Sequence, residues 1–131
     1  MSRIEDLIRE RCPNGVEFRT VADVAKYVRG ITYSKNDEQG EGPVRVLRSN
    51  NITLSSNTLN FEDVKRVSER VKVRKDQKLY KDDILISAAS GSKAHVGKVA
   101  FIAEDIDYVF GAFMAVLRTS GAIAPRFLFH L

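Results

Sequence analysis

Apolar residues follow a helical spacing in three short segments of the chain. Residues 2–11 place their apolar side chains three and four positions apart, which predicts a helix. Thr20 and Asp23 have the spacing of a capping box, which predicts a second helix that runs to about Ala25. Pro125 suits the first turn of a third helix at the end of the chain.

Most of the remaining chain shows the alternation and the short apolar runs that are typical of strands. The polar stretches 34–43 and 53–63 are predicted as loops or irregular segments. The valines of 64–75 fit both a helix and a strand, and we expect a short strand followed by a short helix there. Strands are expected at 27–31, 44–47, 84–86, 97–102, 108–110 and 113–117.

This order of elements predicts an α/β (mixed α+β) fold in which short strands dominate. We expect a compact single domain over residues 1–131, with a twisted, mostly antiparallel sheet of short strands and a few short helices. Cys12 is the single cysteine, which excludes an internal disulfide and a metal site built from paired cysteines. With no signal peptide and no run of about 18 apolar residues, we expect a cytoplasmic protein with no membrane partner.

The net charge of +4 is unevenly distributed along the chain. Residues 1–65 carry ten basic and ten acidic side chains, whereas residues 66–131 carry eleven basic and seven acidic ones. Most of the excess lies in 65–81, with eight basic and two acidic residues. Such a segment favours a polyanionic partner, and it is equally compatible with an ordinary solvated face.

Motifs for catalysis are incomplete. Between Gly91 and Gly97 lie five residues where a phosphate-binding loop has four, and Val99 follows Lys98 where that loop has serine or threonine. Asp63 and Lys65 have a nuclease-like spacing without an upstream Pro-Asp pair. The Asp82-Asp83 pair is typical of a turn. We therefore expect no catalytic residue, no cofactor and no metal.

The chain resembles the type I restriction DNA-specificity domain over its whole length. The resemblance is carried by the order and spacing of five segments, at 18–30, 43–52, 79–86, 90–99 and 127–131. One departure is Asp82-Asp83, where the family commonly has Gly-Asp, so a turn that depends on glycine is in doubt.

The resemblance implies that the chain is half of a specificity subunit and is itself not catalytic. The complete subunit is expected to read a split double-stranded DNA target, to hold methyltransferase subunits and, through them, to direct motor-nuclease restriction subunits. The long helix and the second recognition domain of such a subunit are expected to lie outside this chain. Phe127, Leu128 and Leu131 are therefore expected to begin that helix and to leave an apolar face for a partner helix.

Base-reading candidates lie in two places. Arg48 can pair bidentately with guanine, and Asn50 and Asn51 can each match the major-groove edge of adenine, although both asparagines also suit a turn. Beside Gly91, a loop rich in hydrogen-bond donors is a second candidate, with a small strand connection as the alternative. Its candidate contacts are Ser90, Ser92, Lys93 and His95.

Phosphate contacts are expected from Lys72, Arg74 and Lys75 in the basic segment, and Lys35 in the 34–43 loop is a further candidate DNA contact. Aromatic residues make up 8% of the chain and include no tryptophan, so duplex DNA is a better expectation than stacked single strands. The alternative function is a basic protein–protein interaction module that reads no DNA sequence.

Overall fold

The computed structural model describes residues 3–12, 14, 20–88, 97–121 and 123–130. The helices are α1 (Arg3–Arg11), α2 (Val21–Val24) and α3 (Pro125–Phe129), and three short 3-10 helices are η1 (Lys35–Asp37), η2 (Ser49–Asn51) and η3 (Lys75–Gln77). The strands are β1 (Ala25–Arg29), β2 (Val44–Leu47), β3 (Ile52–Thr53), β4 (Thr58–Leu59), β5 (Lys65–Val67), β6 (Lys78–Leu79), β7 (Ile84–Ser87), β8 (Val99–Phe101), β9 (Ile106–Phe110) and β10 (Met114–Thr119).

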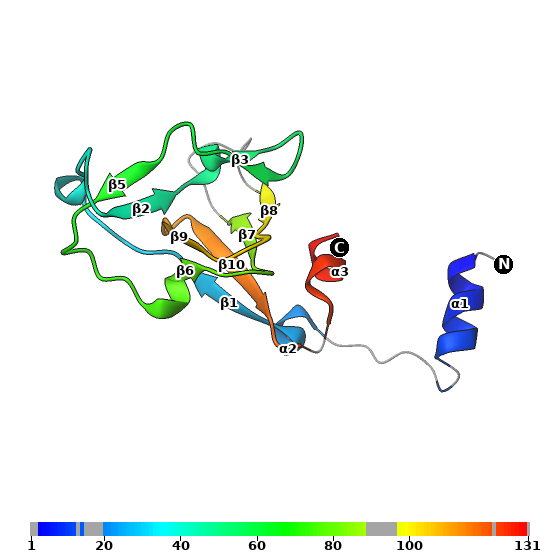
Figure 1. Cartoon of the computed structure of the whole chain (residues 1–131). Coiled ribbons are helices and arrows are strands. Elements are labelled where there is room, and N and C mark those ends of the chain that lie inside the picture. The colour runs from blue at the N-terminus through cyan, green and yellow to red at the C-terminus, as the bar shows by residue number, and fades with distance from the viewer. Residues whose placement is uncertain (1–2, 13, 15–19, 89–96, 122, 131) are drawn as a thin grey trace.

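These strands form two four-stranded sheets and one two-stranded hairpin (Figure 1). The first sheet has the order β1-β10-β7-β8 and the second has the order β5-β2-β9-β6, while β3 pairs with β4. Every pair is antiparallel except β2–β9. The predicted α/β class with short, mostly antiparallel strands is confirmed, although the strands are divided among several sheets.

Alternate side chains of each strand point to opposite faces of the sheet, and the two faces pack into different apolar clusters. Leu85 and Phe110 belong to the central cluster, which joins residues of both four-stranded sheets. Their neighbours point away from it: Ile84 packs with Leu128 of α3 on the outer face of the first sheet. Val109 packs with Val71 on the outer face of the second. This period of two is what a strand dictates.

The predicted local elements are largely present. Thr20 caps α2: its side chain accepts a hydrogen bond from the Asp23 amide, and the Asp23 carboxylate accepts one from the Thr20 amide. Pro125 occupies the first turn of α3, as predicted. Between β5 and η3 the chain does not form the expected helix beyond the single turn of η3, because Val71 and Val73 pack on the second sheet.

The face expected at the end of the chain is only partly exposed. Phe127 is 60% exposed, whereas Leu128 is buried against Ala25 and Ile84. Leu131 lies outside the described residues. None of the helices in the described ranges is long and apolar enough to span a membrane.

Gly30 is the point at which the first sheet meets the second. Its amide donates to the Met114 carbonyl, and the next amide, that of Ile31, donates to the Phe110 carbonyl. A Cβ atom at Gly30 would collide with the carbonyl oxygens of Phe110 and Gly111. The absence of a side chain therefore allows two backbones to touch at this junction.

A buried ion pair fixes the turn that leads into β7. Asp83 is 1% exposed, and its carboxylate accepts hydrogen bonds of 2.8 Å from both Nε and Nη2 of Arg118 in β10. The same carboxylate accepts from the Tyr80 amide, and Arg118 also donates to the carbonyls of Asp76 and Lys78. The carboxylate raises the pKa of Arg118 through these hydrogen bonds. Asp83 is thus part of the turn, as its sequence context indicates.

Asp82 adopts the backbone conformation that favours glycine, with φ of 73°. The turn therefore keeps its left-handed residue although this chain has aspartate where related sequences were expected to have glycine. Aspartate tolerates this region better than most residues with a side chain, which is why the turn survives.

Replacing Gly30 with alanine should lower the free energy of unfolding by about 2 kcal/mol, because the added methyl group meets rigid backbone. Urea denaturation measures the change. Gly40→Ala is the matched control, since nothing lies within 4 Å of its Cβ position. Its stability should change by less than about 0.5 kcal/mol. Equal effects of the two substitutions would contradict the role of Gly30.

Asp82→Gly should be more stable than Asp82→Ala by about 1 kcal/mol, because only glycine enters the left-handed region without steric cost. The wild-type protein should lie between them. Denaturation midpoints of the three proteins, compared at equal slope, test the order. An alanine variant as stable as the glycine variant would show that this turn stores no strain.

Candidate nucleic-acid interface

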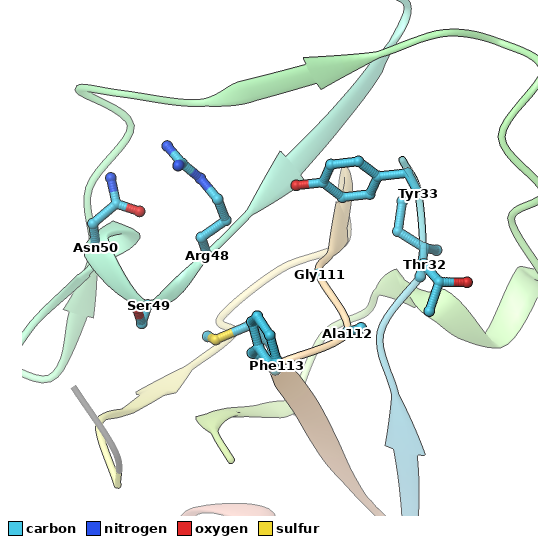
Figure 2. A pocket seen from close by; sticks show the side chains of 10 residues that line it. Thr32, Tyr33, Arg48, Ser49, Asn50, Gly111, Ala112 and Phe113 are labelled. Atoms are coloured by element: carbon cyan, nitrogen blue, oxygen red, sulfur yellow. The ribbon is translucent and has the colours of Figure 1, made fainter. Parts of the chain in front are cut away.

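A cavity of about 440 Å³ lies where β2 and β9 end (Figure 2). Three segments surround it: the chain after β1, the η2 turn after β2, and the turn between β9 and β10. Because β2 and β9 are parallel, their carboxyl ends lie side by side. Among the described residues, the lining includes no carboxylate; it consists of Ile31, Thr32, Tyr33, Arg48, Ser49, Asn50, Gly111, Ala112, Phe113 and Met114.

Asn51 is fully buried and holds the η2 turn together. Its Oδ1 accepts a 2.9 Å hydrogen bond from the Arg48 amide, and its Nδ2 donates to the carbonyls of Asn60 and Asp63 at 3.0 and 3.1 Å. The amide is occupied inside the protein, so the structure gives Asn51 a structural role. Of the two turn residues that the sequence offered as base readers, this one does not reach the surface.

Asn50 is exposed beside the cavity, as Figure 2 shows. Its carbonyl accepts a hydrogen bond from Nδ2 of Asn60, which fixes the backbone. No hydrogen bond from its side chain to another described residue is present, so the carboxamide can present a donor and an acceptor together.

Arg48 lines the same cavity but has a partner in the protein. Its Nη2 donates to the Asp63 carbonyl at 3.2 Å and to Oδ2 of Asp63 at 3.1 Å. The Asp63 side chain is 77% exposed, so this ion pair is open to water and contributes about 1 kcal/mol at most. An external acceptor can therefore compete with Asp63 for the guanidinium group.

Tyr33 faces Arg48 across the cavity (Figure 2). Burial raises the pKa of its phenol, and the charge of Glu38 adds to this, while the charge of Arg48 opposes it. The hydroxyl therefore remains protonated near neutral pH and can donate as well as accept a hydrogen bond.

The donor-rich loop predicted from Ser90, Ser92, Lys93 and His95 lies outside the described residues, but both of its flanks are described. On one side, the Ala88 amide donates to the Phe113 carbonyl at 3.0 Å. On the other, Nζ of Lys98, a buried lysine, lies 3.5 Å from the Ser49 carbonyl. The two flanks of this loop are thus tied to two segments that line the cavity.

The predicted phosphate contacts lie at the other end of β2. Val71 and Val73 pack on the second sheet, so Lys72 and Arg74 between and after them point outward and are exposed. Arg74 donates to the Asp76 carboxylate at 3.0 Å and lowers its pKa, whereas neither Lys72 nor Lys75 forms an ion pair with a described residue.

A shallow second cavity of about 540 Å³ separates this basic segment from the start of β2. Arg74 and Lys75 line it together with Arg45, and two carboxylates, those of Glu69 and Asp107, also line it. The four residues of β2 span about 10 Å between the two cavities.

Lys35 stands in neither cavity. It begins η1, where it is exposed, and the structure places it beside the end of β5 through the hydrogen bond from the Ser68 amide to the Asp37 carbonyl.

Four residues at the first cavity escaped prediction from the sequence. Tyr33 and Phe113 line it, Arg29 donates from Nη2 to the Ala112 carbonyl at 3.2 Å, and Lys98 contacts the η2 turn. Only Phe113 carried a local signal, as a large aromatic residue beside the glycine of a strand connection. Within the described ranges, no group of three or more potential metal ligands is placed to hold a metal ion.

Asn51→Ala should lower the free energy of unfolding by about 2–3 kcal/mol, because it removes three hydrogen bonds that a fully buried side chain makes to the backbone. Asn50→Ala is the matched control one residue away and should change stability by less than about 0.5 kcal/mol. Chemical denaturation of both variants measures the difference. If the two losses are equal, the assignment of the buried and the exposed asparagine is incorrect.

Comparison with known proteins places this chain in a family. The chain is 31% identical over 125 residues to the type I restriction enzyme StySPI specificity subunit of Salmonella potsdam, covering 93% of this chain and 26% of that protein. It is 32% identical over 123 residues to the type I restriction enzyme EcoKI specificity subunit of Escherichia coli (strain K12), covering 92% of this chain and 26% of that protein. The chain thus spans about a quarter of the length of these relatives. Residues 13–131 match the family model of the type I restriction modification DNA specificity domain, and the chain belongs to this family.

Proposed function

We propose that this chain is a target-recognition domain that binds double-stranded DNA sequence-specifically as part of a type I specificity subunit. Its membership of the DNA specificity domain family over residues 13–131 carries the proposal. In this role the chain supplies recognition and no catalytic residue. The assembled subunit positions methyltransferase subunits on the target and, through them, restriction subunits.

Base reading is assigned to the first cavity and to the loop predicted at 90–95, whose described flanks reach that cavity. The exposed carboxamide of Asn50 matches the acceptor and donor that adenine presents in the major groove. Arg48 can exchange its exposed partner Asp63 for the two acceptors of guanine. Ser90, Ser92, Lys93 and His95 remain proposed contacts because the flanks of their loop reach the same cavity.

Phosphate binding is assigned to the basic segment. Lys72 and Lys75 are exposed and have no carboxylate partner among the described residues, so they can neutralise phosphates without first breaking an ion pair. Arg74 must compete with Asp76 for its contact. Lys35 is a further phosphate candidate. Such contacts set the position of the duplex, whereas the cavity residues select its sequence.

Neutralising Lys72, Arg74 and Lys75 together should weaken binding to target and non-target duplexes alike. The slope of log affinity against log salt should fall by about 0.9 for each phosphate that the variant no longer neutralises. The measurement is a salt titration of duplex binding by the complete specificity subunit assembled with its methyltransferase subunits. Lys81→Gln, an exposed cation at the end of the basic segment that lines neither cavity, serves as the control. An unchanged slope in the triple variant would show that Lys72, Arg74 and Lys75 do not face DNA.

In the same assay, Asn50→Ala should reduce the difference in affinity between target and non-target duplexes and leave the salt slope unchanged. Removing one hydrogen-bonded base reader costs about 1–3 kcal/mol on the correct sequence alone. If the wild-type assembly shows no preference for a target duplex but still binds methyltransferase subunits, the chain is a protein-interaction module and the proposed function fails.

A further inference from the structure

Phe113 is an exposed aromatic residue at the tip of the turn between β9 and β10. Its side chain is 65% exposed, and it forms one wall of the first cavity (Figure 2). The preceding strand ends in buried Phe110 and the next begins with buried Met114, so the turn places one phenyl ring outside between two core residues. A ring with this much exposed surface contributes less to folding through the hydrophobic effect than a buried one does.

The backbone around this ring is fixed from several directions. Within the turn, the Met114 amide donates to the Gly111 carbonyl, and the Gly111 amide donates to the Leu47 carbonyl of β2. The carbonyls of Ala112 and Phe113 accept from Arg29 of β1 and from the Ala88 amide after β7. Four hydrogen bonds thus join the turn to itself and to three other segments, which holds the ring at a defined place on the surface.

The surroundings of the ring fit an anionic partner with polar edges. Arg48 lines the cavity and pairs with Asp63, while Arg29 donates to the turn at the Ala112 carbonyl. The described lining residues include no carboxylate, in contrast to the second cavity with Glu69 and Asp107. Tyr33 and Asn50 add a hydroxyl and a carboxamide to the same space. The site therefore combines one apolar wall with neutral and cationic hydrogen-bond donors.

We propose that Phe113 is a specificity-determining residue that contacts the C5 methyl group of a thymine in the major groove, an inference that rests on the proposed DNA binding. In that groove an A·T pair presents acceptor, donor and acceptor groups followed by a methyl group, and the methyl is the one apolar feature of any base pair there. A carboxamide beside a phenyl ring is complementary to this pattern: Asn50 faces the polar edge and Phe113 the methyl group.

The test removes that methyl group by replacing each thymine of the bound half-site, one at a time, with uracil. The protein is the complete specificity subunit assembled with its methyltransferase subunits, and duplex affinity is measured at fixed salt. One of these replacements should weaken wild-type binding about fourfold, because burying one methyl group contributes about 0.8 kcal/mol to the binding free energy. Phe113→Ala should bind the normal target about fourfold more weakly and should be indifferent to the same uracil.

Tyr27→Ala is the matched control, since Tyr27 of β1 is also an exposed aromatic residue, at 54%, but does not line the cavity. It should keep the wild-type response to uracil. Wild-type binding that ignores uracil at every position would overturn the proposal. A Phe113→Ala variant that keeps the fourfold response to uracil would also overturn the proposal. If such a variant in addition loses its methyltransferase subunits, Phe113 is a protein contact. Failure of the proposed function is distinct from these results, because the wild-type assembly would then show no preference for the target duplex.

Discussion

The rest of the structure depends on one direct contact between two backbone segments, at Gly30 and at Phe110–Gly111. The first sheet ends there through β1, and the second passes into the first there through β9 and β10. Because no side chain separates them, hydrogen bonds link Gly30 to Met114 and Ile31 to Phe110. The walls of the first cavity are therefore fixed by the same contact that joins the sheets.

Elements with local chemical causes could be predicted from the sequence. The capping box of Thr20 and Asp23, the alternation of Val44–Leu47 and the proline at the start of α3 each act over a few residues. The structure of 68–74 could not be predicted, because its valines fit both the helical and the strand spacing. Packing of Val71 and Val73 on the second sheet decides the outcome, and that sheet is assembled from residues distant in the sequence.

The candidate site was also predictable in part, because some of its residues belong to local sequence patterns. A turn of polar residues after β2 and a small-residue loop after β7 mark strand ends, where binding groups gather on a rigid scaffold. The sequence does not distinguish Asn50 from Asn51, since the two are identical neighbours. Their roles separate only in the folded chain, where the carbonyls of Asn60 and Asp63 accept hydrogen bonds from the side chain of Asn51. Arg29 and Tyr33 join the site through contacts across the sheets, which no local pattern encodes.

The buried amide of Asn51 separates the shape of a turn from the chemistry that it presents. Because this side chain carries the hydrogen bonds that set the path of 48–51, the residue at position 50 contributes little to the conformation that it occupies. Evolution or a designed library can therefore exchange the exposed side chain and inherit the scaffold unchanged. Such a division of labour between adjacent residues lets the exposed chemistry of a turn vary while its conformation is kept.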